Sequence, residues 1–245
     1  MRVPRIYQSA EQPWPLQVDI ALDDDAANHV GRVLRMNAGQ PLELFNGDGN
    51  NYAATIVESS KRNVIVRLTD VSPNTTEAPV AVHLAQGISR GDRMDFVLQK
   101  SVELGVTEIT PLFTERCGVK LSGERLQKKQ QQWQKIVIAA CEQSGRSVVP
   151  PVHTPVTLAQ WLAAAPEGLR LTLDPYAQKP LRELATTPQQ VTLFIGPEGG
   201  LTDAEVSAAS TQQFLPVRLG PRVLRTETAA LTALSVIQYQ FGDLA

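Results

Sequence analysis

From residue 80 onward, short apolar runs alternate with longer segments whose apolar residues recur at helical spacing. The runs are rich in Val, Ile, Thr and Phe, as buried strands are. They occupy residues 80–85, 107–113, 169–174 and 191–195. Residues 94–104 carry one apolar stripe of a helix that ends at Gly105. Strands separated by helices pair in parallel, so the pattern predicts an α/β fold with helices packed on a parallel sheet.

Residues 1–72 follow a different pattern, with three strand-like runs that predict a small β-rich domain. The runs occupy residues 42–45, 52–57 and 63–68. The segment Asn46-Gly47-Asp48-Gly49-Asn50, between the first two runs, is a strong turn signal. Ahead of the runs, the acidic triplet that begins at Asp23 is placed to cap a short helix.

A polar segment with two prolines, residues 70–79, separates the β-rich part from the strand–helix alternation. Such a composition is typical of a linker between domains. We therefore expect two domains, residues 1–72 and residues 73–245.

Two glycine-bearing loops follow apolar runs near the carboxyl end, one at residues 191–195 and one that ends at Leu219. The first, from Gly196 to Gly200, leads into Thr202-Asp203-Ala204-Glu205, which has the spacing of a capping box at a helix start. The second begins at Gly220 and leads into a helix that starts near residues 226–228. Glycine lets backbone groups approach a flat ligand, and the carboxyl ends of parallel strands share one edge, so we expect a ligand crevice there. An ordinary pair of strand-to-helix turns is the alternative.

Neither loop has the pattern of a phosphate-binding loop, and no Gly-x-Gly-x-x-Gly motif follows a strand. A ligand that is recognised by the main chain in apolar surroundings, such as an adenosine, suits these loops better than a triphosphate. The missing dinucleotide motif also disfavours a nucleotide-dependent oxidoreductase, which the order of elements alone leaves open.

The composition is that of a soluble globular protein. Of the 245 residues, 42% are hydrophobic and 20% are charged, and no apolar run has the length of a membrane span. The polar start of the chain does not resemble a signal peptide. Two cysteines are too few for a disulfide framework, so we expect a reducing cytoplasmic location.

Charge is unevenly distributed along the chain. The net charge is −2, which argues against a uniformly basic nucleic-acid binder. Residues 116–146, however, contain seven basic and two acidic residues. A local basic face of this kind binds phosphates whatever the total charge, and a solvated helix face is the alternative.

The sequence does not indicate a metal site. The histidines and cysteines are His29, His83, His153, Cys117 and Cys141. None of them lies at a spacing typical of metal ligands, so we expect no metal. Cys141 has no neighbouring base in the sequence and is interpreted as a core residue rather than a nucleophile.

Five segments of the chain resemble one known family. GPEGGLT and LGPRVLRTETA, near the carboxyl end, resemble motifs of the SPOUT superfamily of knotted RNA methyltransferases. RGDRMDFVLQKSVELGV, ACEQSGR and VGRVLRMNAGQ are similar to the 16S rRNA uridine-N3 methyltransferase family within it. The resemblance covers most of the chain. It implies a SPOUT-type parallel sheet with a trefoil knot, preceded by a PUA-like β-barrel that binds RNA.

The resemblance also implies S-adenosylmethionine as the cofactor. Together with the strand ends and the glycine loops, it places the cofactor against the residues of one crevice. The candidate cofactor-binding residues are Leu173, Ile195, Gly196, Pro197, Gly199, Leu219, Gly220, Val223, Leu224 and Thr228.

Methylation of a uridine at N3 requires loss of the N3 proton, which leaves the imide anionic. A fixed cation would stabilise that charge and a nearby base would take the proton. Arg225, just before the last helix, is the candidate cation, and Glu198 and Glu142 are the candidate bases or orienting groups.

Basic side chains near the amino end and near the first strand of the second domain are candidates for RNA contacts. His29, Arg32 and Arg35 recur at a spacing of three, which places them on one edge of a helix. Surface solvation is the alternative for each. The full set of candidates is Arg5, His29, Arg32, Arg35, Arg90, Arg93 and Arg146.

The resemblance therefore implies a methyltransferase that acts, as a homodimer, on N3 of a uridine in 16S rRNA of the 30S ribosomal subunit. The composition and the residue spacing indicate neither a membrane nor a metal as a partner. Another SPOUT enzyme, which modifies tRNA or a ribose, is one alternative, and the amino-terminal motif and ACEQSGR argue against it. A non-catalytic RNA-binding protein of ribosome assembly is the other.

Overall fold

The computed structural model describes residues 3–10, 14–60, 63–164, 168–183 and 187–244. The chain forms two compact units. The first consists of Met1–Glu77 together with Cys141–Val149, and the second of Ala78–Ala140 together with Pro150–Ala245. This division falls later than residue 72 and adds a distant segment to the first unit.

The first unit is built on a five-stranded sheet in the order β1-β3-β4-β5-β2. β1 is parallel to β3, and the other pairs are antiparallel. The predicted runs are all strands, and the predicted turn joins β3 to β4. The strands are β1 (Arg5–Tyr7), β2 (Asp19–Ala21), β3 (Pro41–Phe45), β4 (Asn50–Ser59) and β5 (Val64–Pro73).

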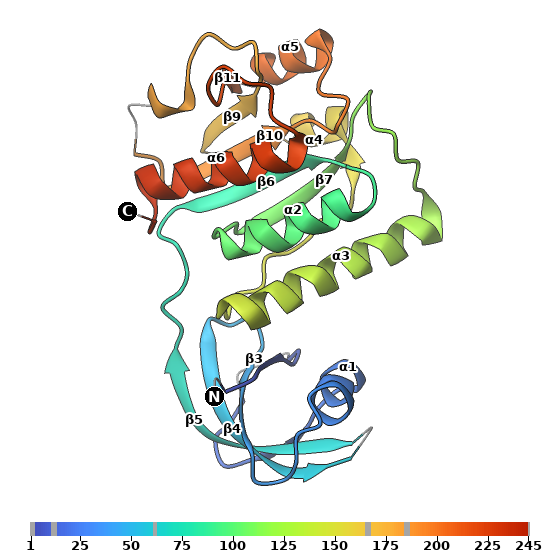
Figure 1. Cartoon of the computed structure of the whole chain (residues 1–245), viewed down its shortest axis with the longest axis vertical. Coiled ribbons are helices and arrows are strands. Elements are labelled where there is room, and N and C mark those ends of the chain that lie inside the picture. Colours follow the sequence, from blue (N-terminus) through green and yellow to red (C-terminus); the bar gives the residue numbers. More distant parts are fainter. Residues whose placement is uncertain (1–2, 11–13, 61–62, 165–167, 184–186, 245) are drawn as a thin grey trace. The chain divides into compact units, whose positions relative to one another are not determined.

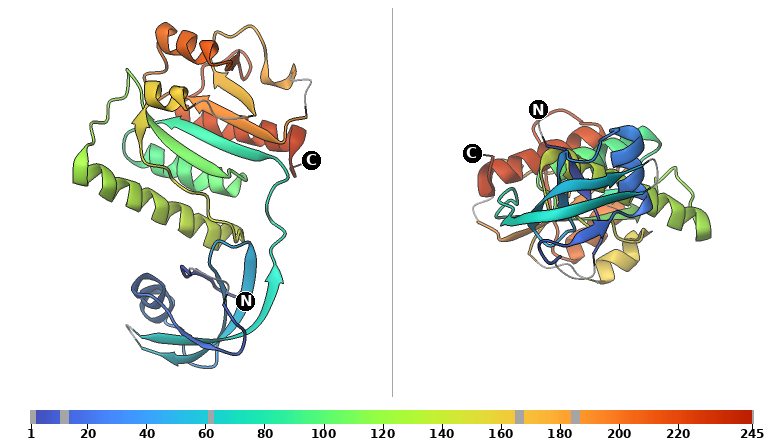
Figure 2. Two further views of the ribbon diagram at one scale, coloured as in Figure 1. Left: turned by 180° about the vertical axis from the view of Figure 1, so that it is seen from behind. Right: turned by 90° about the horizontal axis from the view of Figure 1, so that it is seen from below.

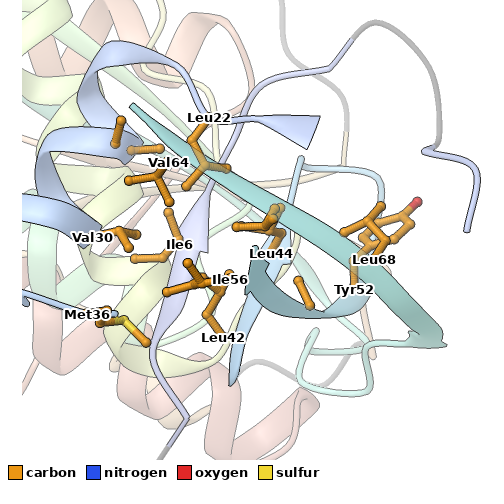
Figure 3. Close-up of a cluster of buried hydrophobic side chains, with 14 residues drawn as sticks. Ile6, Leu22, Val30, Met36, Leu42, Leu44, Tyr52, Ile56, Val64 and Leu68 are labelled. Atoms are coloured by element: carbon orange, nitrogen blue, oxygen red, sulfur yellow. The ribbon is translucent and has the colours of Figure 1, made fainter. Parts of the chain in front are cut away.

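One cluster of buried side chains holds this sheet together (Figure 3). Along β4, Tyr52, Ala54 and Ile56 are buried and alternate with more exposed residues, as expected for a strand with one face on a core. Leu44 and Ile6 from neighbouring strands are fully buried against them. Each such aliphatic side chain contributes roughly 1.5–3 kcal/mol through its removal from water.

The predicted linker is partly wrong, because β5 continues through Pro73. The residues from Asp70 to Pro73 pair with the start of β4, with Pro73 opposite Asn50. Proline is tolerated there because it ends the strand and needs no ladder hydrogen bond beyond it.

The acidic triplet caps a helix as predicted. The Asp23 side chain accepts a hydrogen bond from the Ala26 N–H (2.9 Å) at the start of α1 (Asp24–Asn28). The chain then widens into a π-helical turn, η1 (His29–Val33). Arg35 lies beyond that turn with a left-handed φ of 54°. The prediction that His29, Arg32 and Arg35 share one helical edge is therefore wrong, because Arg35 lies outside the helical segment that contains His29 and Arg32.

The second unit contains a six-stranded sheet in the order β11-β9-β10-β6-β7-β8, and every pair is parallel. This confirms the predicted α/β class. The strands are β6 (Ala81–Gly87), β7 (Glu108–Phe113), β8 (Val156–Thr157), β9 (Leu169–Leu173), β10 (Gln190–Ile195) and β11 (Leu215–Val217).

Helices cover both faces of this sheet (Figures 1 and 2). α2 and α6 lie together on one face, and α4 and α5 lie on the other, where Trp161, Phe194 and Phe214 pack in one cluster. The helices are α2 (Asp92–Glu103), α3 (Gly123–Ser144), α4 (Leu158–Ala163), α5 (Asp203–Thr211) and α6 (Thr226–Phe241), with a short 3-10 turn η2 (Leu181–Glu183). α3 carries four of the seven basic residues of the segment 116–146.

Candidate functional site

A pocket of about 930 Å³ lies at the carboxyl ends of β9, β10 and β11. Three loops and the first turn of α6 form its walls. Leu173 ends β9, Ile195 ends β10, and Leu219 lies just after β11. The crevice that the two glycine loops predict is therefore present.

The loop after β10 is held to the last helix by a buried hydrogen-bond network. The Thr226 hydroxyl donates to the Gly196 carbonyl oxygen (2.6 Å), and the Gln86 side-chain amide donates to the Thr226 hydroxyl (2.9 Å). Thr226 is 6% exposed and Gln86 is fully buried. Neither residue was predicted from the sequence, because each acts through a partner far away along the chain.

Close backbone approach explains the glycines at this point. A Cβ on Gly87 would lie 2.6 Å from the Pro197 nitrogen, and one on Gly196 would lie 2.9 Å from the Leu201 side chain. Gly200 adopts a left-handed φ of 69° in the turn that its N–H closes onto the Pro197 carbonyl (2.9 Å). The loop is therefore shaped by its backbone, as the sequence indicated.

Glu198 joins this loop to the start of α2. Its carboxylate accepts hydrogen bonds from the Arg90 backbone N–H (2.8 Å) and from the Arg93 guanidinium (3.1 Å). Partial burial raises the pKa of Glu198, but these hydrogen bonds outweigh it and hold that pKa below its ordinary value. An ionised carboxylate with its proton affinity reduced in this way is a weak general base, so the geometry favours an orienting role.

Arg116 fixes the far end of the same loop, and the sequence did not predict it as a site residue. Its guanidinium donates to the Gly199 carbonyl (3.1 Å) and lies 3.4 Å from the Leu201 carbonyl. The predicted capping box of α5 is present next to it, with the Thr202 hydroxyl bonded to the Glu205 N–H and the Glu205 carboxylate bonded to the Thr202 N–H. Glu205 also accepts from the Glu115 N–H (2.8 Å), so three chain segments meet here.

The second loop leads from β11 into α6. Val223 is 73% exposed at the pocket, and Arg225 occupies the N-cap position of α6. Gly220, with φ 76°, and Thr228, which is exposed, are not among the residues that line the pocket. The predicted cofactor residues that do line it are Leu173, Ile195, Gly196, Pro197, Gly199, Leu219, Val223 and Leu224.

Charged side chains of both signs surround the pocket. The arginines are Arg93, Arg116, Arg218, Arg222 and Arg225, and the acids are Asp174, Glu198, Asp203 and Glu227. Glu227 is notable because its Oε2 atom is buried without a hydrogen-bond partner among the described residues. Tyr176, which is 81% exposed, also lines the pocket.

Glu142, a predicted catalytic residue, belongs to the first unit and does not line the pocket. It accepts a hydrogen bond from the Tyr7 N–H (3.0 Å) and lies 3.6 Å from His29 Nδ1. Burial raises the pKa of Glu142 above its ordinary value. Its neighbour Cys141 is fully buried, and burial raises the pKa of that thiol to about 12, as expected for a core cysteine.

Two predicted RNA contacts are structural arginines within the first unit. Arg146 is 3% exposed and binds the Glu77 carboxylate with two nitrogens (3.1 and 2.6 Å). Arg5 bonds to Glu43, Asn51 and the Arg146 carbonyl. These placements do not support contact with RNA, because the guanidinium groups are already bound inside the unit.

The other predicted RNA contacts are more accessible. Arg32 and Arg35 are exposed on the first unit, and His29 is partly buried there. Arg93 lines the pocket, whereas Arg90 is exposed and does not. In the part of the chain that the structure describes, no helix combines the length and apolar character needed to cross a membrane.

Known protein families match most of the chain. A family model described as an RNA methyltransferase domain matches residues 76–238, and an RNA methyltransferase PUA domain matches residues 22–69. The ribosomal RNA small subunit methyltransferase E of Buchnera aphidicola subsp. Schizaphis graminum is 35% identical, over 100% of this chain and 99% of that protein. The chain belongs to the ribosomal RNA small subunit methyltransferase E family.

Solved structures agree with membership of the methyltransferase E family. A methyltransferase of Legionella pneumophila, in complex with the cofactor SAM, matches with a TM-score of 0.96 and 49% identity over 100% of both chains. A ribosomal RNA small subunit methyltransferase E of Neisseria gonorrhoeae, bound to S-adenosyl methionine, matches with a TM-score of 0.92 and 36% identity over 100% of both chains. The predicted fold class, a SPOUT-type parallel sheet with a PUA-like domain, is confirmed, and the trefoil knot stays a prediction.

Proposed function

We propose that this protein transfers a methyl group from S-adenosylmethionine to N3 of a specific uridine in the 16S rRNA of the small ribosomal subunit. One observation carries the proposal. The pocket lies where two glycine loops follow β10 and β11, in a chain whose relatives of matching length were solved with this cofactor bound.

The pocket suits S-adenosylmethionine in size and in chemistry. Small-molecule pockets span about 300–1,000 Å³, and this one has about 930 Å³. Ile195, Leu219 and Leu224 supply apolar surface for an adenine ring, while the glycine loops expose backbone groups. When bound, the cofactor supplies an electrophilic methyl group, so the protein has to position the acceptor and handle its proton.

Arg225 is the residue that we assign to the anionic imide. It stands at the N-cap of α6, where the positive end of the helix adds to its charge, and it lines the pocket. Glu198 orients Arg93 and the start of α2 rather than accepting the proton. Glu227 is the stronger candidate for the proton acceptor: its Oε1 lies 4.0 Å from Arg93 Nε, and its buried Oε2 has no hydrogen-bond partner among the described residues.

The arginines around the pocket provide phosphate contacts for the RNA, and the PUA-like unit provides the exposed Arg32 and Arg35. We include a homodimer in the proposal, supported by the exposed Val223 and by Tyr239, which is 65% exposed on α6. A cytoplasmic location accords with two free cysteines.

Methylation of purified small subunits, taken from a strain that lacks this enzyme, tests the proposal. We expect incorporation of one methyl group that nucleoside mass spectrometry maps to uridine N3, with naked 16S rRNA assayed in parallel. Arg225→Ala should lower kcat by about 10²–10³-fold with little change in cofactor affinity. Arg222→Ala, in the same loop, is the matched comparison: loss of a phosphate contact should raise KM for the small subunit and leave kcat nearly unchanged.

Calorimetry with S-adenosylmethionine separates binding from chemistry. We expect saturable binding to the unaltered protein and its loss in Gly196→Val, whose side chain would collide with Leu201. Methylation of a ribose or of tRNA instead of uridine N3 would refute the substrate assignment. Absence of cofactor binding would refute the proposed methyltransferase activity and favour a non-catalytic role in ribosome assembly.

A further inference from the structure

Three side chains from distant parts of the sequence meet at the amino ends of the parallel strands. His83 is near the start of β6, and Glu108, the first residue of β7, is its register partner. His153 follows an extended segment that pairs beside β7, where its N–H donates to the Ile109 carbonyl (2.8 Å). The cofactor pocket lies at the carboxyl ends of the strands, whereas this cluster lies at their amino ends.

Glu108 bridges the two imidazoles. One carboxylate oxygen lies 2.7 Å from His153 Nε2, and the other lies 3.5 Å from His83 Nδ1. One ligand atom from each of the three residues can be chosen so that all lie within 4.8 Å of one another. The three groups therefore converge on one point rather than forming separate surface pairs.

A buried partner orients the His83 ring. Its Nε2 lies 2.8 Å from the Thr110 hydroxyl, which is 4% exposed. When Nε2–H donates to Thr110, the lone pair of Nδ1 is directed toward Glu108. Metal-bound histidines are held in this way, with the second ring nitrogen fixed by a hydrogen bond that sets the tautomer.

The rest of the environment also resembles a metal site. Trp161 meets the His83 ring edge-on, with centroids 6.0 Å apart at 90°, and closes the inner side. The side chains of Glu108 and His153 are 31% and 44% exposed, so the outer side is open to an entering ion and to water.

We propose that His83, Glu108 and His153 form a binding site for a divalent transition metal of the Zn²⁺ class. Two imidazoles and one carboxylate are a ligand set that Zn²⁺ uses with a water in the fourth position. Mg²⁺ prefers oxygen ligands alone and is not expected to bind. Zinc–nitrogen distances of about 2.0–2.1 Å place two ligand nitrogens about 3.4 Å apart, so the exposed His153 ring has to move toward His83 from a spacing of up to 4.8 Å.

Such an ion would link β6, β7 and the segment before β8 at the amino ends of the strands, away from the cofactor pocket. Its effect is therefore on the stability of the second unit rather than on methyl transfer. At a Zn²⁺ concentration of about 100 times Kd, the Tm of the protein should rise by roughly 5–10 °C.

The test uses the full chain, stripped with EDTA and free of affinity tags, titrated with ZnCl₂ by calorimetry. We expect one site per chain with a Kd well below about 100 µM, and no binding of MgCl₂. Glu108→Gln and His153→Gln should each weaken Zn²⁺ binding by at least about tenfold. His29→Gln, a histidine of the first unit, is the matched control and should bind as the unaltered protein does.

Binding of S-adenosylmethionine by each variant checks that it is folded, because that pocket is at the carboxyl ends of the strands. Co²⁺ loaded in place of Zn²⁺ gives a second readout: the site predicts visible bands of nitrogen and oxygen ligation without a thiolate charge-transfer band. Equal Zn²⁺ affinity in all variants, a thiolate band, or no saturable binding would overturn the proposal. In those cases the three residues are a hydrogen-bonded cluster only.

Discussion

Thr226 determines how the first glycine loop meets the last helix. Its hydroxyl donates to the Gly196 carbonyl and accepts from Gln86, so one side chain satisfies two buried polar groups. Gly196 and Thr226 both line the pocket. Thr226 therefore positions the loop that carries Gly196 and also forms part of the pocket wall. A buried network of this kind is rigid when every partner is present.

Replacement of Thr226 by valine keeps the shape and removes the hydroxyl. We expect Thr226→Val to lower the free energy of unfolding by about 1–3 kcal/mol, because Gly196 and Gln86 lose a buried partner. Affinity for S-adenosylmethionine should fall by about tenfold as the loop loosens. Urea unfolding and calorimetry measure the two effects.

Thr228→Val is the control for that experiment. Thr228 is exposed on the same helix and lies outside the pocket lining, so both quantities should be unchanged. A loss of cofactor affinity in Thr228→Val would support the original prediction that Thr228 binds the cofactor.

The sequence predicted pocket residues that act through their own backbone and missed those that act on another segment. Gly196 and Leu219 follow directly from apolar runs that end in glycine loops. Arg116 and Gln86 reach this loop from far along the chain, and no local pattern marks them. Sequence also does not distinguish a buried, ion-paired arginine such as Arg146 from a surface arginine, because the difference is made by Glu77.

At the scale of elements, the turn between β3 and β4 shows how polar residues fix a hairpin. The Asn46 side chain accepts from the Asp48 N–H (3.0 Å), and Asp48 accepts from the Asn50 N–H (2.8 Å). The Tyr52 hydroxyl, on β4, donates to Asp48 (2.6 Å) and fixes the turn to the sheet. Burial and this carboxylate raise the pKa of Tyr52 to about 12.

That pKa predicts a loss of stability at alkaline pH. The folded state holds the Tyr52 proton more tightly than the unfolded state, whose pKa is about 10. The stabilisation is therefore complete below about pH 10 and is lost as pH rises toward 12. Tyr52→Phe should be less stable by about 1–2 kcal/mol at neutral pH, and this difference should shrink above pH 10.

Urea unfolding midpoints between pH 8 and about 11.5 give the difference in stability between Tyr52→Phe and the unaltered protein. Titration of other groups affects both proteins equally and cancels in this difference. Tyr239→Phe, at an exposed position of α6, should show no such convergence with the unaltered protein. A constant gap between Tyr52→Phe and the unaltered protein would contradict the raised pKa.

The sequence predicted the type of each helix or strand better than its length. Each β-branched run that the sequence indicated is a strand, since burial in a sheet selects such residues. The ends differ because tertiary contacts decide them. β5 runs to Pro73 because it pairs with Asn50, and α3 continues to Ser144 through residues that pack in the first unit.

At the scale of the whole molecule, a short segment far along the chain completes the first unit. Residues 141–149 belong to it, and Arg146 binds Glu77 from the end of the amino-terminal part. The Asn74 side chain donates to the Gly145 carbonyl (2.9 Å) and so ties the same two stretches together. The first unit is therefore incomplete without a piece that the sequence pattern assigned elsewhere.

Removal of the Arg146 guanidinium should destabilise this unit. We expect Arg146→Ala to lower its free energy of unfolding by about 2–4 kcal/mol, because the Glu77 carboxylate loses its buried cationic partner. Arg32→Ala, at an exposed position of the same unit, should change stability by no more than about 0.5 kcal/mol. Thermal unfolding measures both, and a stable Arg146→Ala with weakened RNA binding would restore the predicted RNA contact.

The composite make-up of the first unit limits how the polypeptide can be divided. The backbone passes from one unit to the other at residues 77–78, 140–141 and 149–150. No single cut releases either unit whole, so a truncated gene ending in the linker would encode a fragment that lacks its last structural piece. The sequences of the two units are interleaved, so neither unit can be transferred to another protein as one continuous segment.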